Sequence, residues 1–184
     1  MARSSTALHE QLLAAALRLF VQHGFRGTSL ADIAAEVGCS KASLLYHFRN
    51  KEAILGELLL PVGKEVVALD ARLAVLDGDA AVRAGITGLV DLTVRFRQEI
   101  KVLFDNMADA TALREADIEG LEGVGQRLVD ALAGGSSAPL DQVAARMALG
   151  GMFLTGASEL QLDERSLREA MTISALRTLG RTPG

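Results

Sequence analysis

The side chains best suited to bind another molecule lie close together, between residues 40 and 48. Lys41, Ala42 and Ser43 fall in the first turn of a predicted helix. The first turn of such a helix can enter the major groove of DNA, where Lys41 can reach a guanine edge or a phosphate. In the same groove Ala42 can offer its methyl group to a thymine, and Ser43 can donate a hydrogen bond to a base or a phosphate. The alternative is a solvated helix start that contacts nothing.

Two short helices, over residues 30–37 and 40–47, must position these side chains. Their spacing is that of a helix-turn-helix. Ala34 is small enough to let the helices cross closely, and Leu44 packs the second helix against the first. Gly38 turns the chain between them, because glycine readily adopts a positive φ. The polar face that remains on the second helix therefore predicts DNA reading.

Five pieces of sequence follow one another in this region: LRLF, HGFRGTS, LADIAAEVGCS, LYHF and NKEAIL. Together they resemble the DNA-binding domain of the tetracycline-repressor (TetR) family of regulators. The resemblance implies an all-α chain with an N-terminal three-helix helix-turn-helix DNA-binding domain over residues 1–50. It also implies a C-terminal helical ligand-binding and dimerisation domain over residues 51–184, linked to the first by the helix that starts near residue 51.

Further DNA contacts are predicted where helices begin and where the second helix of the motif ends. Thr28 and Lys51 lie at helix starts, where free N–H groups and the positive end of the helix dipole favour phosphate. Thr28 could also be an ordinary cap and Lys51 a solvated charge, and both roles can coexist with a phosphate contact. The resemblance implies that Tyr46 and His47 contact phosphates, with a half-buried aromatic ring as the alternative. Ser40, which can cap the second helix, completes the predicted DNA-binding residues.

Two residues depart from the common pattern of the family. A tyrosine is frequent at the position of Leu45, and we expect Leu45 to be a core residue that leaves one polar DNA contact unmade. Cys39 lies where a small apolar residue such as valine is more common. We expect Cys39 to pack in the turn; the alternative is a redox-sensing thiol, favoured only by the neighbouring helix N-terminus.

Composition favours a helical protein. Of the 184 residues, 49 % are apolar and 4 % aromatic, with three prolines. No apolar run reaches the roughly 20 residues of a membrane-spanning helix, and residues 1–10 lack the apolar core of a signal peptide. We therefore expect a cytoplasmic protein. Residues 1–56 hold six Lys and Arg against four Asp and Glu, whereas the whole chain has a net charge of −4. A basic N-terminal part on an acidic body fits a protein that touches DNA at one end.

Apolar spacing and capping residues predict the other helices. Gly24 should end a first helix, and Ser29 with Asp32 forms a capping box for the next. Asn50 can cap a fourth helix, which we expect to kink or break at Pro61. The remaining predicted helices cover residues 80–107, 118–132, 140–160 and 164–179, and the first helix covers residues 6–23.

No catalytic or metal-binding pattern is present. We find no nucleophile elbow, no HExxH, no glycine-rich phosphate loop and no CxxC. We therefore predict that the protein is not an enzyme and needs no cofactor or metal. Gly150, Gly151 and Gly156 fall in an apolar helical segment, where small residues let another helix approach closely.

The second domain is expected to bind a ligand and a second copy of the chain. Met and Phe side chains suit the wall of an apolar ligand cavity, with an ordinary core as the alternative. The candidates are Phe96, Phe104, Met107, Met152 and Phe153. Apolar and small residues of the last two helices are predicted to form the dimer interface. These are Met147, Gly150, Gly151, Leu154, Leu167 and Met171.

The resulting hypothesis is a ligand-responsive transcriptional regulator, a repressor that binds a palindromic double-stranded DNA operator as a homodimer. An unknown small-molecule effector would release it from DNA by changing the separation of the two DNA-binding domains. The alternative is an all-α protein that sequesters a small molecule, or an enzyme, with a vestigial DNA-binding domain. No membrane partner is expected.

Overall fold

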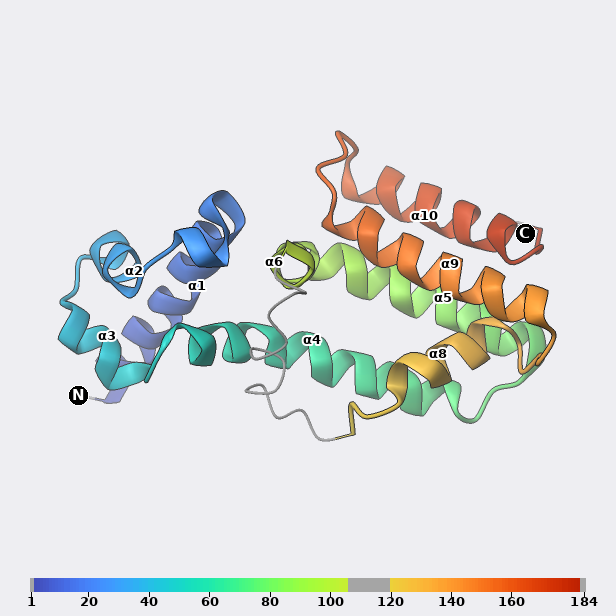
Figure 1. Cartoon of the computed structure of the whole chain (residues 1–184), viewed down its shortest axis with the longest axis horizontal. Coiled ribbons are helices and arrows are strands. Elements are labelled where there is room, and N and C mark those ends of the chain that lie inside the picture. The colour runs from blue at the N-terminus through green and yellow to red at the C-terminus, as the bar shows by residue number, and fades with distance from the viewer. Residues whose placement is uncertain (1, 106–119, 183–184) are drawn as a thin grey trace. The chain divides into compact units, whose positions relative to one another are not determined.

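Every regular element in the computed structural model is an α-helix, within the residues it describes, 2–105 and 120–182. The all-α prediction is therefore confirmed (Figure 1). The helices are α1 (Ala2–Gly27), α2 (Leu30–Val37), α3 (Lys41–His47), α4 (Lys51–Leu73), α5 (Gly78–Arg95), α6 (Arg97–Asp105), α8 (Val124–Leu132), α9 (Pro139–Ala157) and α10 (Glu164–Thr178). A membrane-spanning helix would need more length and apolarity than any helix in these ranges has.

The described chain forms two compact units. Unit 1 contains residues 2–61 and 101–105, and unit 2 contains residues 62–100 and 120–182. The chain passes from one unit to the other within α4 and again within α6. Each unit has its own apolar core.

The first helix of unit 1 is bent back by a glycine, as predicted. Gly24 has φ 74° and ψ 160°, outside the helical region. This conformation favours glycine, and it returns Phe25 to the core. The Phe25 ring lies edge-to-face on Phe20, with ring centroids 5.1 Å apart. Both side chains are buried, so the end of α1 is anchored to the unit-1 core.

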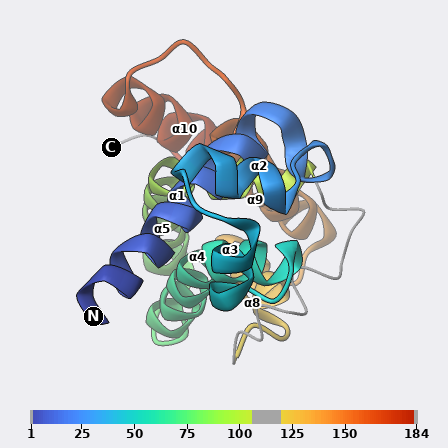
Figure 2. The ribbon, with the colours of Figure 1, turned by 90° about the vertical axis from the view of Figure 1, so that its left-hand side faces the viewer.

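Local hydrogen bonds set the bounds of α2, as its sequence predicted. Asp32 N donates to Ser29 Oγ (3.2 Å), and Ser29 N donates to Asp32 Oδ2 (2.8 Å), which completes the capping box. The side-chain and backbone hydrogen bonds of Ser29 also lower the pKa of Asp32 from its ordinary value. Gly38, with φ 74°, ends the helix and turns the chain toward α3. Figure 2, in which unit 1 faces the viewer, shows α2 and α3 on either side of this turn.

In unit 2, α5 packs against α8, α9 and α10, and α9 also packs against α8 and α10 (Figure 1). Gly156 of α9 allows one of these approaches. A Cβ atom added to Gly156 would lie 2.9 Å from Thr93 Cβ and 3.0 Å from the Thr93 carbonyl oxygen. The prediction that small residues admit a neighbouring helix is therefore confirmed at Gly156. Gly150 and Gly151 face open space in the single chain.

Several of the predicted helix boundaries are wrong. The helix expected over residues 118–132 begins only at Val124. Of the kink or break expected at Pro61, the break is not present, because α4 continues through Pro61 to Leu73. The helix expected over residues 80–107 is divided at Phe96, which has φ −108° and ψ 30°. Because apolar spacing continues across Phe96, the periodicity did not reveal this change of direction.

Candidate nucleic-acid interface

One side of α3 is exposed and the other is buried. Leu44 is fully buried in the unit-1 core, whereas Lys41 and Ala42 are exposed and Tyr46 is 84 % exposed. The Lys41 side chain makes no hydrogen bond or ion pair with any other described residue. Lys41, Ala42 and Tyr46 are thus available to a partner, as the spacing predicted. Ser43, on the border of this face, is half-buried.

The orientation of α3 depends on its capping and packing, because a helix of seven residues is not stable in isolation. Ser43 N donates to Ser40 Oγ (3.1 Å), so Ser40 caps the helix as predicted. At the other end, Phe48 is buried and its N–H donates to the Leu44 carbonyl (2.9 Å). Capping and burial together fix the exposed side of α3.

His47 is half-buried beside a second histidine that the sequence did not single out. The centroids of the His47 and His9 rings are 5.6 Å apart, and the His9 ring stacks on Phe48 at 4.5 Å. His9 Nε2 and Glu57 Oε1 are 2.5 Å apart, which links α1 to α4. His9 therefore helps to hold the end of α3. No local pattern could identify it, since its carboxylate partner lies 48 residues away.

The structure gives Lys51 partners within unit 1, and its contact with a DNA phosphate stays a prediction. Its ammonium group donates to the Thr28 carbonyl (2.8 Å) and to the Phe25 carbonyl, and it lies 4.3 Å from the centroid of the Phe25 ring. Lys51 is therefore not a solvated charge. It joins the start of α4 to the loop after α1, and two of its three N–H donors are occupied there.

The prediction that the Thr28 side chain contacts a DNA phosphate is corrected by its burial. Its side chain is 2 % exposed, and its hydroxyl donates to the carbonyls of Gly24 (2.9 Å) and Leu19 (3.2 Å). A buried hydroxyl with partners inside the unit is not available to a phosphate. Thr28 is a structural residue of the turn before α2.

Leu45 and Cys39 complete the surroundings of the motif. The expectation that Leu45 is a core residue is wrong, because Leu45 is 44 % exposed on the same side of α3 as Lys41. Its neighbour Leu44 fills the inward position instead. Cys39 is half-buried and packs against the unit-1 core, as predicted.

The proposed ligand-cavity residues that the structure describes are divided between the two units. Met152 is buried in the core of unit 2, and Phe153 is half-buried against that core. Phe96 is half-buried at the end of α5, and Phe104 belongs to unit 1. Met107 lies outside the described residues. The predicted cavity with all five in its wall therefore stays a prediction.

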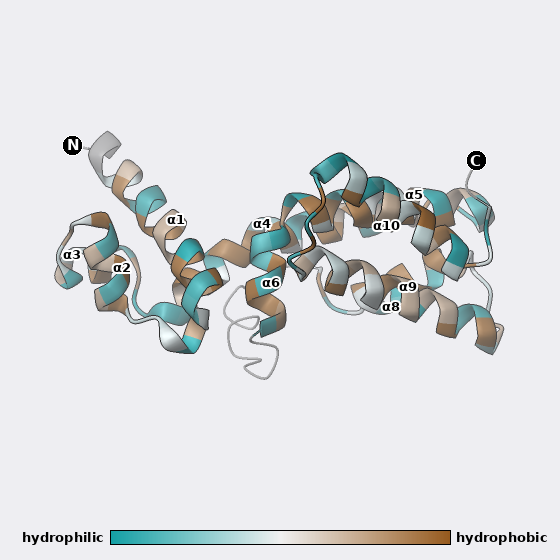
Figure 3. Ribbon diagram, turned by 90° about the horizontal axis from the view of Figure 1, so that it is seen from above, coloured by the Kyte–Doolittle hydropathy of each residue, from teal (hydrophilic) through white to brown (hydrophobic). Residues whose placement is uncertain are grey.

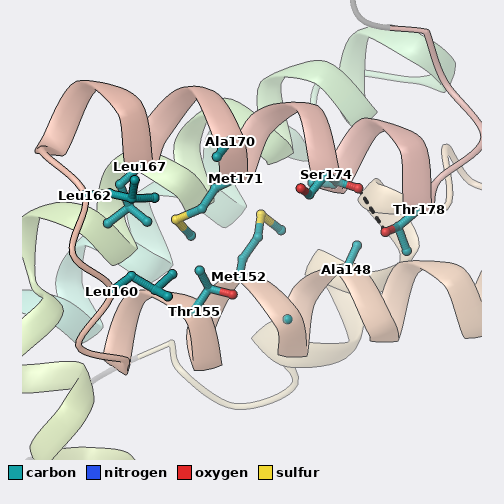
Figure 4. A pocket seen from close by; sticks show the side chains of 12 residues that line it. Ala148, Met152, Thr155, Leu160, Leu162, Leu167, Ala170, Met171, Ser174 and Thr178 are labelled. Carbon is teal, nitrogen blue, oxygen red and sulfur yellow. Dashed lines mark hydrogen bonds between the residues drawn. The ribbon is translucent and has the colours of Figure 1, made fainter.

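An apolar groove of about 260 Å³ lies between α9 and α10. Met152 of α9 and Met171 of α10 both extend into the space between the two helices (Figure 4). Gly151 and Thr155 line it from α9, and Ala170 lines it from α10. Of the four predicted cavity residues that the structure describes, Met152 alone lines this groove.

The predicted interface residues divide into two groups. Met147 (65 % exposed) and Leu154 (63 % exposed) lie on the outer side of α9, where Gly150 and Gly151 are also exposed. Leu167 and Met171 of α10 are buried in the core of unit 2. The predicted place of these two residues in the interface is corrected, because side chains of their own unit already bury them. Residues of α10 that are exposed and line the groove include Ala170, Ser174 and Thr178.

Comparisons with known sequences agree with this geometry. The model of the family described as bacterial regulatory proteins, tetR family, matches residues 12–58. The chain is 48 % identical over 52 residues to the HTH-type transcriptional regulator RutR of Escherichia coli strain K12, a match that covers 28 % of this chain and 24 % of RutR. It is 43 % identical over 47 residues to IcaR of Staphylococcus epidermidis, the HTH-type negative transcriptional regulator of the biofilm operon icaADBC. This match covers 26 % of this chain and 25 % of IcaR. The matches span about a quarter of the length of these curated relatives.

Solved structures share the fold over nearly the whole chain. AmtR of Mycobacterium smegmatis has a TM-score of 0.70 and 24 % identity, covering 96 % of this chain and 87 % of AmtR. The ketosteroid transcriptional regulator KstR2 of Mycobacterium tuberculosis aligns to this chain with a TM-score of 0.76 and 16 % identity. This alignment covers 94 % of this chain and 93 % of KstR2. At these identities the likeness shows the fold.

A capped second helix with an exposed face, followed by a helical second unit, defines a chain with a helix-turn-helix in its first unit. The helix-turn-helix region, residues 12–58, is similar to that of the tetR family of bacterial regulatory proteins.

Proposed function

We propose that this protein is a DNA-binding transcriptional regulator that acts as a repressor. The observation that carries the proposal is the exposed side of α3, with Lys41, Ala42 and Tyr46 turned outward while Leu44 is buried. Lys41 and Ser43 would contact base edges or phosphates, and Tyr46 and His47 would contact phosphates. Ser40 would hold the helix at the required angle through its cap.

We propose that the protein acts as a homodimer on a palindromic operator. Support comes from the outer side of α9, where Leu140, Val143, Met147 and Leu154 are all exposed. Brown, apolar segments recur along α9 in Figure 3. A contiguous apolar stripe of this kind is unfavourable in water and suits an identical stripe on a second copy. The groove between α9 and α10 would receive side chains of that copy.

We also propose that a small molecule bound by unit 2 releases the DNA. The support is that unit 2 is a compact unit with an apolar core of its own, distinct from the core of the unit that contains α3. Such a ligand lowers operator affinity only if it binds the DNA-free conformation more tightly than the DNA-bound one. A compound that raises the melting temperature of the free protein and weakens its operator complex would meet this requirement.

The DNA-binding proposal is tested by selecting sequences from a random duplex library and measuring their affinity by fluorescence anisotropy. Lys41→Ala and Ser43→Ala should change which bases are preferred. The logarithm of the affinity should fall linearly with the logarithm of the salt concentration, with a slope of roughly −0.9 per phosphate neutralised. A folded wild-type protein that enriches no sequence would refute the proposal and favour a small-molecule sequestering protein.

The dimer proposal is tested with Gly151→Glu, which places a charge on the outer side of α9. The control is Gly125→Glu on α8, since at either glycine an added Cβ meets nothing within 4 Å. Gly151→Glu should give monomers with weakened operator binding in sedimentation and anisotropy measurements, and Gly125→Glu should behave as wild type. If both variants remained dimers with full DNA affinity, the interface would lie elsewhere.

A further inference from the structure

Leu45 is an exposed apolar side chain on the side of α3 that carries the proposed DNA contacts. It is 44 % exposed, whereas Leu44 beside it is fully buried. Residues four apart lie on the same side of a helix, so Leu45 follows Lys41 and Tyr46 follows Ala42. The side of α3 that would enter the groove therefore combines a charge, a methyl group, a leucine and a tyrosine.

The chemistry of the major groove limits what Leu45 can recognise there. A leucine side chain has no hydrogen-bonding group, so it cannot read guanine, adenine or cytosine through their donors and acceptors. The C5-methyl group of thymine is the apolar feature that a base pair presents in this groove. Contact with that methyl group would remove both apolar surfaces from water.

We propose that Leu45 is a specificity-determining residue that recognises the methyl group of a thymine in each half-site. This inference rests on the proposed DNA-binding function. The rise of an α-helix is about 1.5 Å per residue, so Leu45 lies about 6 Å along the axis from Lys41. The thymine should therefore lie within about two base pairs of the base or phosphate that Lys41 contacts.

The experiment replaces each thymine of a selected operator, one at a time, with deoxyuridine, which lacks the methyl group but keeps every hydrogen-bonding group. At one position per half-site, wild-type affinity should fall about fourfold, the equivalent of roughly 0.8 kcal/mol for one buried methyl or methylene group. Leu45→Ala should bind the thymine and uracil operators equally at that position. Lys41→Ala should keep the wild-type ratio between the two.

A second probe tests the methyl group apart from the base. With cytosine at the same position, 5-methylcytosine should restore part of the lost affinity for the wild type and none for Leu45→Ala. Because Leu45 is exposed, Leu45→Ala should keep the wild-type circular dichroism spectrum, and Leu45→Met should keep the preference for thymine. A thymine read by Ala42 would stay sensitive to uracil in Leu45→Ala, which distinguishes the two contacts.

The possible results separate this inference from the function on which it rests. If wild type binds a selected operator but no thymine position loses its sensitivity in Leu45→Ala, the inference is overturned and DNA binding stands. If Leu45→Ala loses affinity equally for thymine and uracil operators while keeping their ratio, Leu45 contacts the backbone, and the inference is again overturned. If folded wild-type protein enriches no DNA, both fail.

Discussion

Gly156 provides the sharpest test of the packing in unit 2. A Cβ atom at this position would lie 2.9 Å from Thr93 Cβ and 3.0 Å from the Thr93 carbonyl oxygen. Carbon atoms pack at about 3.5–4.0 Å, so Gly156→Ala requires α5 and α9 to separate locally by roughly 0.6–1 Å. The Thr93 carbonyl belongs to the backbone of α5 and cannot rotate away. Overpacking of this kind costs about 1–3 kcal/mol.

The same substitution also has a favourable effect, which a matched control removes. Alanine in a helix interior is more stable than glycine by about 0.5–1 kcal/mol. Gly125→Ala, in α8, gains this preference without a clash, because nothing lies within 4 Å of the added Cβ and Gly125 lies outside the proposed dimer surface. The difference between the two variants therefore isolates the overpacking cost. Gly156→Ala should be less stable than Gly125→Ala by about 1–3 kcal/mol.

The measurement is urea unfolding followed by circular dichroism, at one fixed protein concentration because dimerisation would shift the midpoint. Gly88→Ala adds a second comparison. Its Cβ would meet the methyl groups of Leu69, which can change rotamer, so it should cost less than Gly156→Ala. Equal stability of the Gly156 and Gly125 variants, or a larger cost at Gly88, would refute this account of the α5–α9 contact.

Three further predictions follow from single contacts. Lys51→Met should destabilise unit 1 by about 1–3 kcal/mol in urea unfolding, because the Phe25 and Thr28 carbonyls lose a charged donor; an unchanged midpoint would show that these contacts are not formed in solution. Burial raises the pKa of Glu99, so its carboxylate lowers stability as the pH rises above the ordinary value for glutamate. Glu99→Gln should therefore raise the urea midpoint at pH 7 and leave it nearly unchanged at pH 4, and the opposite pattern would reject the assigned cause. Cys39→Val should keep the fold and DNA affinity, and a peroxide-dependent loss of binding that Cys39→Val abolishes would establish a thiol switch instead.

The sequence alone determined the helix-turn-helix because its elements are set by short-range interactions. The capping pair Ser29 and Asp32, the positive φ of Gly38 and the Ser40 cap each act within three or four residues. α2 accordingly begins and ends at the residues predicted for it. Burial of Leu44 followed from the same spacing.

The tertiary structure alone decided which of the remaining side chains are available to a partner. The donors of Lys51 are occupied by carbonyls 23 and 26 residues away, and the hydroxyl of Thr28 reaches back to α1. Leu45 is exposed because Leu44 takes the one inward position that the packing of α3 offers. Leu167 is buried because its own unit covers it, although its apolar spacing is like that of an interface. A side chain's exposure depends on neighbours that are distant in sequence, and a local pattern carries no information about which of them will cover it.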